Sequence, residues 1–339
     1  MLVCQKEPLL QCRDNVLKIE DYDYDLPPGL IAQEPCVKRD ECKLLVVNSD
    51  GKIEHKHFFD IVDYLTPNDV LVVNRSKVFK ARLLGHKDGG GNAEVLLLEK
   101  IKGNKWKALG KNLKEGQKIN FDNKYFGKVI KREGSEVEVE LNFDEKVIEQ
   151  IGITPLPPYI KTDRDYSEEY QTIYAKEIGS SAAPTAGLHF TTELKDKLIK
   201  NGVKWEEVVL HVGLGTFKKV EEKNIVEKKL HSEYFEIDDG TWERLKKHKE
   251  EGKRIIAVGT TALRALETGK QRGYTNIFIY PPYQFKVVDS LITNFHLPKT
   301  SLLMLISALL KGRDWKTIYK EAIKEKYRFF SFGDAMFVL

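Results

Sequence analysis

A block of short β-rich runs in the first half of the chain constrains its fold more than any other feature. Between about residues 60 and 154, the runs 70–73, 93–98 and 137–141 are separated by turn formers that recur about every 8 to 12 residues. No long stretch with helical spacing interrupts them. This pattern predicts a small antiparallel barrel or sandwich.

The sequence pattern changes after Leu156-Pro157-Pro158, where helical spacing of apolar residues begins to alternate with short apolar runs. Residues 192–200 carry apolar side chains at helical spacing and end at Asn201-Gly202, a typical helix stop. Further on, 254–258 is predicted as a buried strand and 262–267 as a helix. Strands and helices in alternation indicate an α/β layer.

The N-terminal 59 residues contain one strong strand, 44–47, and little else that could fold alone. We therefore expect them to pack onto the C-terminal α/β layer. The predicted fold class is α/β, with a discontinuous catalytic main domain formed by residues 1–59 and 155–339. A small antiparallel β-barrel, residues 60–154, is predicted to be inserted into it.

Composition restricts the class of protein. The chain has 339 residues, 41% hydrophobic and 31% charged, and no apolar run near the ~20 residues that a membrane span needs. Without a secretory signal at its N-terminus, we expect a soluble cytoplasmic protein. No coiled-coil pattern or long apolar edge is evident, so a monomer is expected. A net charge of +4 is compatible with a nucleic-acid partner without demonstrating one.

Four segments of the second half, 179–190, 210–217, 258–261 and 291–298, share an unusual mixture of Gly, Thr, His and apolar residues. Small residues let the backbone approach a ligand closely, so these segments predict one composite pocket. At Gly259-Thr260-Thr261 a strand passes into a helix, with a threonine placed to cap it and N–H groups open to an anion. An ordinary turn explains that junction equally well, and neither common nucleotide-binding glycine fingerprint is present.

Three histidines of these segments, His189, His211 and His296, lie between apolar neighbours. A lone histidine in such a setting is more often a hydrogen-bonded core residue, but three in matching contexts favour a role in acid–base chemistry. Their spacing does not indicate a zinc site. Four cysteines near the N-terminus lack the CxxC spacing of a metal or redox motif, so free thiols are expected.

The stretch 100–114 carries six lysines, no acidic residue and Trp106 at its centre. Interleaved lysines and an aromatic ring can follow a phosphate backbone and stack on an exposed base. A solvated strand-and-turn face is the simpler alternative. The two interpretations remain open from composition alone.

Taken together, the motifs resemble the S-adenosylmethionine:tRNA ribosyltransferase-isomerases of queuosine biosynthesis. The likeness runs through most of the chain, at 24–27, 30–35, 39–40, 74–78, 81–83, 156–160, 170–175, 183–190, 210–217, 258–267, 287–298 and 327–336. The family's architecture, a discontinuous α/β domain with an inserted β-barrel, agrees with the organisation inferred above.

The resemblance implies that the ribosyl group of S-adenosylmethionine is transferred and isomerised onto the aminomethyl arm of a 7-deazaguanine at the tRNA wobble position. Epoxyqueuosine in tRNA would form, with release of adenine and methionine. S-adenosylmethionine is then a consumed co-substrate, and neither a resident cofactor nor a metal is expected.

This chemistry suggests roles for the singled-out residues. A sulfonium makes the adjacent ribose carbon acidic, so a base is needed, and His189, His211 and His296 are the candidates. Arg264 is expected to pair with the methionine carboxylate. The other expected substrate-binding residues are Thr185, Gly187, Gly213, Gly215, Thr216, Gly259, Thr260, Thr261, Asp289, Thr293, Asn294 and Asp334. Those expected to bind tRNA are Arg75, Lys77, Lys80, Arg82, Lys105, Trp106 and Lys107.

Two alternatives remain at this point. A tRNA-binding relative without catalysis would fit the departures from the family pattern, among them Arg75, Lys80 and Pro282. An ordinary S-adenosylmethionine-dependent methyltransferase is disfavoured because the expected glycine-rich loop is absent. The products distinguish all three possibilities, since methyl transfer would release S-adenosylhomocysteine instead of adenine.

Overall fold

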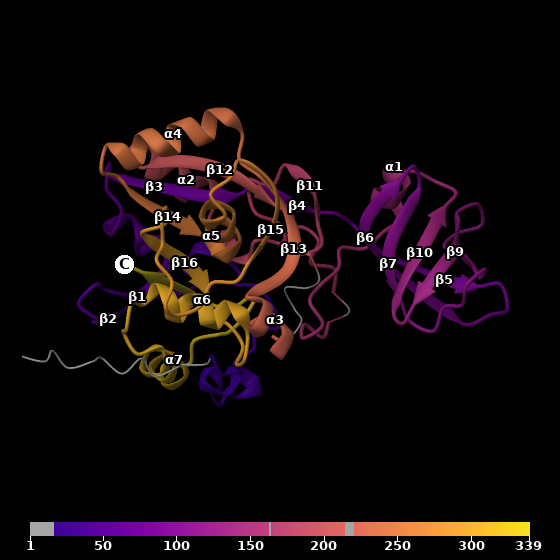
Figure 1. Cartoon of the computed structure of the whole chain (residues 1–339), viewed down its shortest axis with the longest axis horizontal. Helices are drawn as coiled ribbons and strands as arrows, with labels where there is room; N and C mark the ends of the chain where they lie inside the picture. Colours follow the sequence, from indigo (N-terminus) through magenta and orange to yellow (C-terminus); the bar gives the residue numbers. More distant parts are fainter. Residues whose placement is uncertain (1–16, 163, 214–219) are drawn as a thin grey trace, which may run out of the picture.

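A large mixed sheet organises the main body of the protein (Figure 1). The structure, a computed structural model, describes residues 17–162, 164–213 and 220–339. Its nine-stranded sheet has the order β15 (Arg272–Ile277), β13 (Lys229–Glu236), β12 (Lys204–Leu210), β3 (Asp69–Asn74), β14 (Arg254–Val258), β16 (Ser290–Asn294), β17 (Ala335–Val338), β1 (Lys43–Val47) and β2 (Ile53–His57).

The four central strands, β12, β3, β14 and β16, run parallel to one another. Neighbouring strands are in register at their ends: Val73 of β3 lies opposite Val258 of β14, and Val258 lies opposite Ile292 of β16. Their carboxyl ends therefore meet at one edge of the sheet. Ligand sites of open parallel sheets lie outside that edge.

Both faces of this central sheet are buried. On β3, Val70 and Val72 pack into one apolar cluster, whereas Leu71 and Val73 pack into another on the opposite face. The first cluster is shared with helices α5 (Gly259–Glu267), α6 (Ser301–Leu309) and α7 (Trp315–Lys324). The second is shared with α2 (Thr192–Lys200) and the 3₁₀ helix η4 (Phe58–Asp63). Parallel sheets are stable when covered in this way.

The remaining helices are peripheral. Helix α4 (Asp239–Glu250) contacts β12 and β14, and the short α3 (Glu222–Glu227) contacts β13. Four more 3₁₀ turns occur in the described chain, η1 (Ile19–Tyr22), η2 (Pro28–Leu30), η3 (Arg39–Glu41) and η5 (Thr185–His189). No helix of the described residues is both long and apolar enough to span a membrane.

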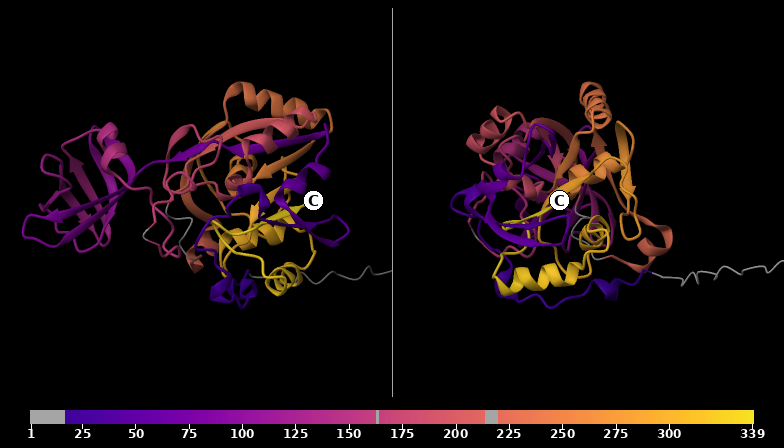
Figure 2. Two further views of the ribbon diagram at one scale, coloured as in Figure 1. Left: turned by 180° about the vertical axis from the view of Figure 1, so that it is seen from behind. Right: turned by 90° about the vertical axis from the view of Figure 1, so that its left-hand side faces the viewer.

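The inserted module is a closed antiparallel barrel that projects from the main body (Figure 2). Its strand order is β10 (Glu136–Leu141), β7 (Lys105–Gly110), β6 (Asn92–Lys102), β5 (Arg82–Lys87), β8 (Lys118–Asn120) and β9 (Phe126–Glu133), with α1 (Glu145–Ile151) following. In β10, buried Val137, Val139 and Leu141 alternate with outward-facing glutamates. This period of two is typical of a strand with one buried face.

The predicted fold class is confirmed, with one correction to the barrel boundary. Residues 70–73, which were predicted to belong to the barrel, form β3 at the centre of the large sheet. The predicted start at residue 60 is therefore too early, since the first barrel strand, β5, begins at Arg82. The strand β1, in contrast, pairs with β17 as expected for an N-terminal segment that packs on the C-terminal layer.

A two-stranded neck joins the barrel to the main body. The chain leaves through β4 (Ser76–Val78) and returns to pair with it in parallel through β11 (Glu177–Ser180). Asn74, fully buried, fixes the exit point: its Oδ1 accepts from the amides of Ser76 at 3.1 Å and Leu210 at 3.0 Å, and its Nδ2 donates to the Leu210 carbonyl at 2.9 Å.

The Asn74 network predicts a measurable stability effect. Asn74→Ala removes three buried hydrogen bonds and leaves their backbone partners unpaired, so we expect the free energy of unfolding to fall by roughly 2 to 4 kcal/mol. Urea denaturation followed by circular dichroism measures this. The exposed Asn123→Ala is the matched control, and an equal effect of both variants would contradict the role of Asn74.

Candidate active site

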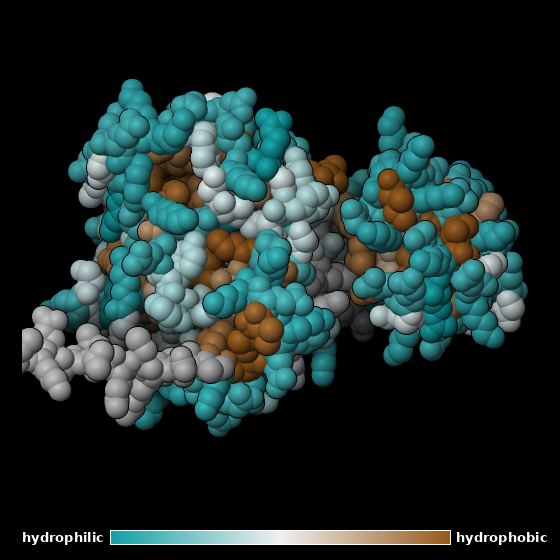
Figure 3. All heavy atoms as spheres, viewed as in Figure 1, coloured by the Kyte–Doolittle hydropathy of each residue, from teal (hydrophilic) through white to brown (hydrophobic). Residues whose placement is uncertain are grey.

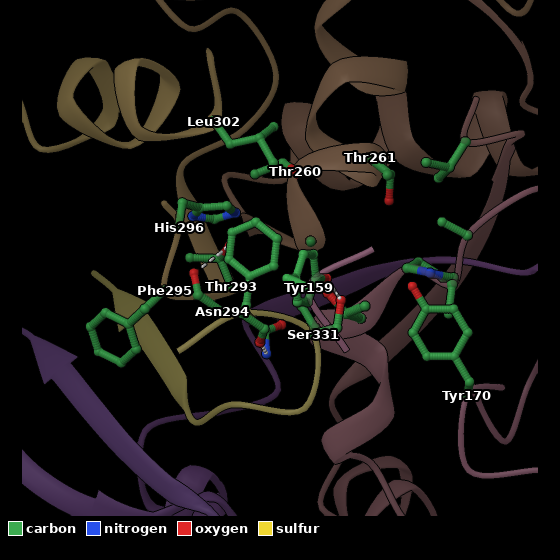
Figure 4. A pocket seen from close by; sticks show the side chains of 18 residues that line it. Tyr159, Tyr170, Thr260, Thr261, Thr293, Asn294, Phe295, His296, Leu302 and Ser331 are labelled. Atoms are coloured by element: carbon green, nitrogen blue, oxygen red, sulfur yellow. Dashed lines mark hydrogen bonds between the residues drawn. The ribbon is translucent and has the colours of Figure 1, made fainter. Parts of the chain in front are cut away.

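All four small-residue segments contribute to one hollow at the carboxyl edge of the sheet, the segment 210–217 through Val212. Residues 259–261 follow β14 and 295–296 follow β16, while 180–190 run beside them. Together they line a hollow of about 70 Å³ (Figure 4). Its lining is Tyr159, Tyr170, Ala182, Ala183, Pro184, Thr185, Ala186, Val212, Gly259, Thr260, Thr261, Thr293, Asn294, Phe295, His296, Leu302, Phe330 and Ser331.

The hollow contains polar atoms that lack partners. Thr261 Oγ1, Asn294 Oδ1 and His296 Nδ1 are buried and have no hydrogen-bond partner among the described residues. Native proteins leave few such atoms unpaired, because each costs about 1 to 3 kcal/mol. In Figure 4 the Thr261 hydroxyl and the His296 ring point into the hollow. The buried Tyr170 hydroxyl of the lining also lacks a partner in the described chain, and four unpaired polar atoms around one hollow indicate a ligand site.

The first turn of α5 differs from its prediction. A threonine was expected to cap this helix, but its N-cap residue is Val258, and no side chain bonds to the first turn. Gly259 adopts a φ of +89°, which favours glycine at this tight junction. Thr260 and Thr261 are instead within the helix and line the hollow. The first N–H groups of α5 are consequently left without a side-chain cap.

His296 is the predicted histidine that lies in the hollow. Its backbone N–H donates to the Tyr319 hydroxyl at 3.2 Å, which fixes the residue at the end of β16. Burial lowers the pKa of His296 to about 3, so the imidazole is neutral at physiological pH.

His189 lies behind the wall of the hollow. Its Nδ1 is 2.9 Å from Cys42 Sγ, and its Nε2 is 3.3 Å from Asn294 Nδ2. Burial, together with the charges of Arg328 and Arg39, lowers the pKa of His189 to about 3. Because its two ring nitrogens contact Cys42 and Asn294, His189 orients the Asn294 side chain. His189 itself does not line the hollow.

His211 belongs to a different cavity, the large cleft between the barrel and the main sheet. Its ring stacks on Tyr234 at 5.8 Å between centroids, and a Cβ on Gly179 would lie 2.8 Å from the ring. Burial lowers the pKa of His211. The structure thus separates the three predicted histidines into three environments.

Arg264, expected to bind a carboxylate of the substrate, forms an ion pair with Glu233 instead. Both side chains are buried, and Glu233 Oε1 also accepts from the Gly213 amide at 2.9 Å and lies 3.0 Å from His231 Nε2. Although burial opposes its charge, Arg264 and His231 lower the pKa of Glu233 to about 2. The guanidinium is therefore already neutralised by the protein.

Two predicted carboxylates lie away from the hollow. Asp289 precedes β16 at its amino end, where it accepts from Lys249 Nζ at 2.7 Å and from the Ile255 amide at 2.8 Å. Five strand residues separate it from the carboxyl edge, about 17 Å at 3.3 Å per residue. Asp334 accepts from the amides of Lys43 and Arg328, and burial raises its pKa. Both carboxylates stabilise the fold, and the expectation that they bind substrate is not supported by their positions.

The other predicted substrate residues divide into four groups. Thr185, Gly259, Thr260, Thr261, Thr293 and Asn294 line the hollow. Gly187 permits close packing, because a Cβ there would lie 1.9 Å from the Tyr174 hydroxyl, and Gly213 lines the large cleft. Gly215 and Thr216 lie outside the described residues.

The predicted tRNA-binding residues also divide by environment. Arg75 lies 3.5 Å from Glu177, Arg82 pairs with Glu94 at 2.8 Å, Lys105 lies 3.7 Å from Glu140 and Lys107 lies 3.2 Å from Glu99. Lys77 and Lys80, on the neck, have no ion pair with any described residue. The charge of Lys80 also acts on Asp165, and Lys77 and Lys80 are the least neutralised cations of this set.

Trp106 was expected to stack on an exposed base, and this expectation is wrong because the face of its ring is not open to solvent. Only 7% of the residue is exposed, and its ring stacks on Phe79 at 5.8 Å inside the barrel. Trp106 alternates with exposed lysines along β7, so it points inward. The alternation of Trp106 with Lys105 and Lys107 in the sequence already indicated this inward orientation.

Several lining residues were missed from the sequence. Tyr159, Tyr170 and Ser331 line the hollow, and Glu233 holds the backbone at Gly213. The two tyrosines lie within segments that carry the family resemblance, which was the available indication. Glu233 gave none, because one glutamate on an alternating strand resembles any solvent-facing residue.

Known proteins similar to this chain share one family and one named activity. A family model described as queuosine biosynthesis protein matches residues 19–338. An S-adenosylmethionine:tRNA ribosyltransferase-isomerase of Acetivibrio thermocellus is 49% identical, over 95% of this chain and 100% of the relative. The relative of that name in Thermotoga maritima is 46% identical over the same shares.

A solved structure agrees with these relatives. The crystal structure of an S-adenosylmethionine tRNA ribosyltransferase from Thermotoga maritima is 37% identical in sequence, with a TM-score of 0.55. It covers 94% of this chain and 100% of its own. Among the described residues, no group of three or more His, Cys, Asp and Glu side chains is placed to hold a metal ion.

Burial of the two neutral histidines predicts a pH dependence of stability. His189 and His296 have folded-state pKa values near 3, below the value of about 6.5 in an unfolded chain. The unfolded state therefore binds more protons below pH 6.5, and stability falls as the pH decreases from 6.5 toward 5. Each histidine contributes a slope that approaches about 1.4 kcal/mol per pH unit.

His296→Gln should reduce this slope by the contribution of one histidine. Urea denaturation at several pH values between 6.5 and 5 measures it, above the range where carboxylates dominate. His86→Gln, at an exposed position of the barrel, is the control. An unchanged slope for His296→Gln would show that His296 takes up a proton in the folded protein.

Proposed function

This chain belongs to the queuosine biosynthesis family of S-adenosylmethionine:tRNA ribosyltransferase-isomerases, and on that premise we propose which reaction its hollow supports. The enzyme transfers and isomerises the ribosyl group of S-adenosylmethionine onto the aminomethyl group of 7-aminomethyl-7-deazaguanine at the wobble position of tRNA. Epoxyqueuosine remains in the tRNA, and adenine and methionine leave. S-adenosylmethionine is consumed, so no resident cofactor is needed.

One observation carries this proposal: the hollow presents unpaired polar atoms at the carboxyl edge of the central strands. The Asn294 Oδ1 can accept from the exocyclic amine of adenine, and the Thr261 hydroxyl can donate to a ring nitrogen or accept from ribose. The uncapped amides at the start of α5 suit the carboxylate of the methionine moiety. These three features match a zwitterionic nucleoside better than a purely apolar ligand.

His296 is proposed as the proton acceptor. In the tautomer that carries its proton on Nε2, the unpaired Nδ1 offers a lone pair to the hollow. A neutral ring is required, since the carbon beside a sulfonium loses a proton to a base. The same burial makes the ring a weak base, so the step depends on the acidity that the sulfonium gives to the neighbouring ribose carbon.

The reaction is tested by mixing the protein with S-adenosylmethionine and tRNA that carries the aminomethyl-deazaguanine. We expect adenine, methionine and a mass gain at the wobble nucleoside. S-adenosylhomocysteine in place of adenine would indicate a methyltransferase. Binding of tRNA with no product would indicate a relative without catalysis.

In the same assay, His296→Gln should lower turnover roughly 100-fold or more, the usual contribution of a general base. The dissociation constant for S-adenosylmethionine, measured by calorimetry, should change far less. His55→Gln, at the distant edge strand β2, is the control and should retain activity. A variant that loses affinity in proportion to turnover would make His296 a binding residue.

The neck lysines should contribute charge to tRNA binding. Lys77→Ala with Lys80→Ala should weaken binding and reduce the slope of log affinity against log salt by about 1 per lysine. Lys105→Ala with Lys107→Ala is the matched pair, because both lysines are within reach of barrel glutamates. Filter binding at several salt concentrations decides, and equal slopes for the two double variants would contradict the assignment.

Cytoplasmic residence and a monomeric state are parts of the same proposal. Cytoplasmic residence is supported by the tRNA substrate named for the relatives.

A further inference from the structure

The cleft between the barrel and the main sheet has no role in the account above. It encloses about 910 Å³, within the range of small-molecule and nucleotide sites. The barrel contributes apolar side chains such as Phe79, Leu98 and Trp106, and the main body contributes Ile178 and the β13 region. Apolar atoms are visible on both sides of the junction in Figure 3.

The wall on the main-body side is aromatic and partly open to solvent. Tyr234 stacks on His211 at an interplanar angle of 19° and meets Tyr274 edge-on, with centroids 5.7 Å apart. The two tyrosines are direct cross-strand partners on β13 and β15. Tyr274 is 66% exposed and Ile178 57% exposed. Large apolar side chains left in solvent beside a cavity mark an interaction site.

The charges of the cleft exclude a phosphate backbone. Glu99 and Glu233 of its described lining pair with Lys107 and Arg264, which leaves Glu136, Glu145 and Glu149 against a single lysine, His211 and His231. That lysine, Lys100, is paired with Glu145. An acidic aromatic cleft repels phosphates, yet it accepts the uncharged face of a base, and it favours a base that carries an ammonium group.

The cleft adjoins the hollow that holds the reacting groups. Val212 lines both cavities, and the neighbouring residues Ser181 and Ala182 line one each. A base seated in the cleft therefore lies next to a nucleoside seated in the hollow. This is the arrangement that transfer between the two substrates requires.

We propose that Tyr234 and Tyr274 form a stacking wall for the aminomethyl-deazaguanine base of the tRNA anticodon, an inference that rests on the proposed function. The base leaves the anticodon stack, its flat face packs on the tyrosine wall, and its cationic arm enters among carboxylates. The phosphates remain outside the cleft, where the neck lysines lie. Unpaired bases of RNA loops are recognised by aromatic stacking in this manner.

The test replaces the exposed tyrosine while preserving the strand. Tyr274→Val removes the ring but keeps a β-branched side chain suited to an edge strand, and Tyr274→Phe keeps the ring. Binding of an anticodon stem-loop RNA that carries the modified base is measured by fluorescence anisotropy. Tyr274→Val should weaken binding roughly 5- to 100-fold, as for loss of one stacked base, and Tyr274→Phe should stay within about twofold of wild type.

Steady-state kinetics separates the two substrates. Tyr274→Val should raise KM for the RNA and leave KM for S-adenosylmethionine unchanged. Unaltered RNA affinity, or an increase confined to KM for S-adenosylmethionine, would overturn the proposal. Ile101→Ala, an exposed apolar position of the barrel outside the cleft lining, controls for general surface effects.

The two proposals fail separately in these experiments. If wild type binds the RNA through Tyr274 but releases no adenine, the stacking wall stands and the proposed reaction is wrong. If wild type forms the product and Tyr274→Val binds RNA normally, the reaction stands and the stacking wall is wrong.

Discussion

Parallel pairing of the four central strands is the constraint on which the rest of the structure depends. Because β12, β3, β14 and β16 run in one direction and in register, the segments that follow them emerge at one edge. His211, Gly259 and His296 are therefore placed near the same edge although they are far apart in the sequence. The neck of the barrel emerges there as well, at Asn74. A single geometric rule thus brings together the hollow, the cleft and the inserted module.

Buried polar groups of the described chain differ in how completely they are paired. Glu267, at the end of α5, accepts from the amides of Lys286, Val287 and Val288, each at 2.9 Å, so its burial is fully compensated. The amide of Asn294 is half compensated: its Nδ2 donates to the Phe330 carbonyl, while its Oδ1 has no partner among the described residues. Other buried polar atoms of the described chain, such as Trp205 Nε1 and Arg264 Nη2, also lack partners, but those of the hollow lie together where one ligand can satisfy them.

Local patterns in the sequence predicted the helix 192–200, the strand 254–258 and the alternating strands of the barrel well, because burial of one face imposes a period. The strand 70–73 was assigned to the wrong sheet. Its uninterrupted apolar run is typical of a strand buried on both faces, as in a parallel sheet, whereas the barrel strands alternate. The hollow was predicted from its small residues and threonines. The partners of Arg264, Asp289 and Asp334 depend on residues distant in the chain, which one sequence does not reveal.

The neck has a consequence for the history of the fold. The insertion begins after the last residue of β3 and returns through β11, which pairs with β4 outside the large sheet. Removal or replacement of the barrel would therefore leave every hydrogen bond of the nine-stranded sheet in place. A module joined in this way can be exchanged, lengthened or lost while the scaffold keeps its registration. Selection on the barrel and selection on the catalytic main body can then act on separate parts of one gene.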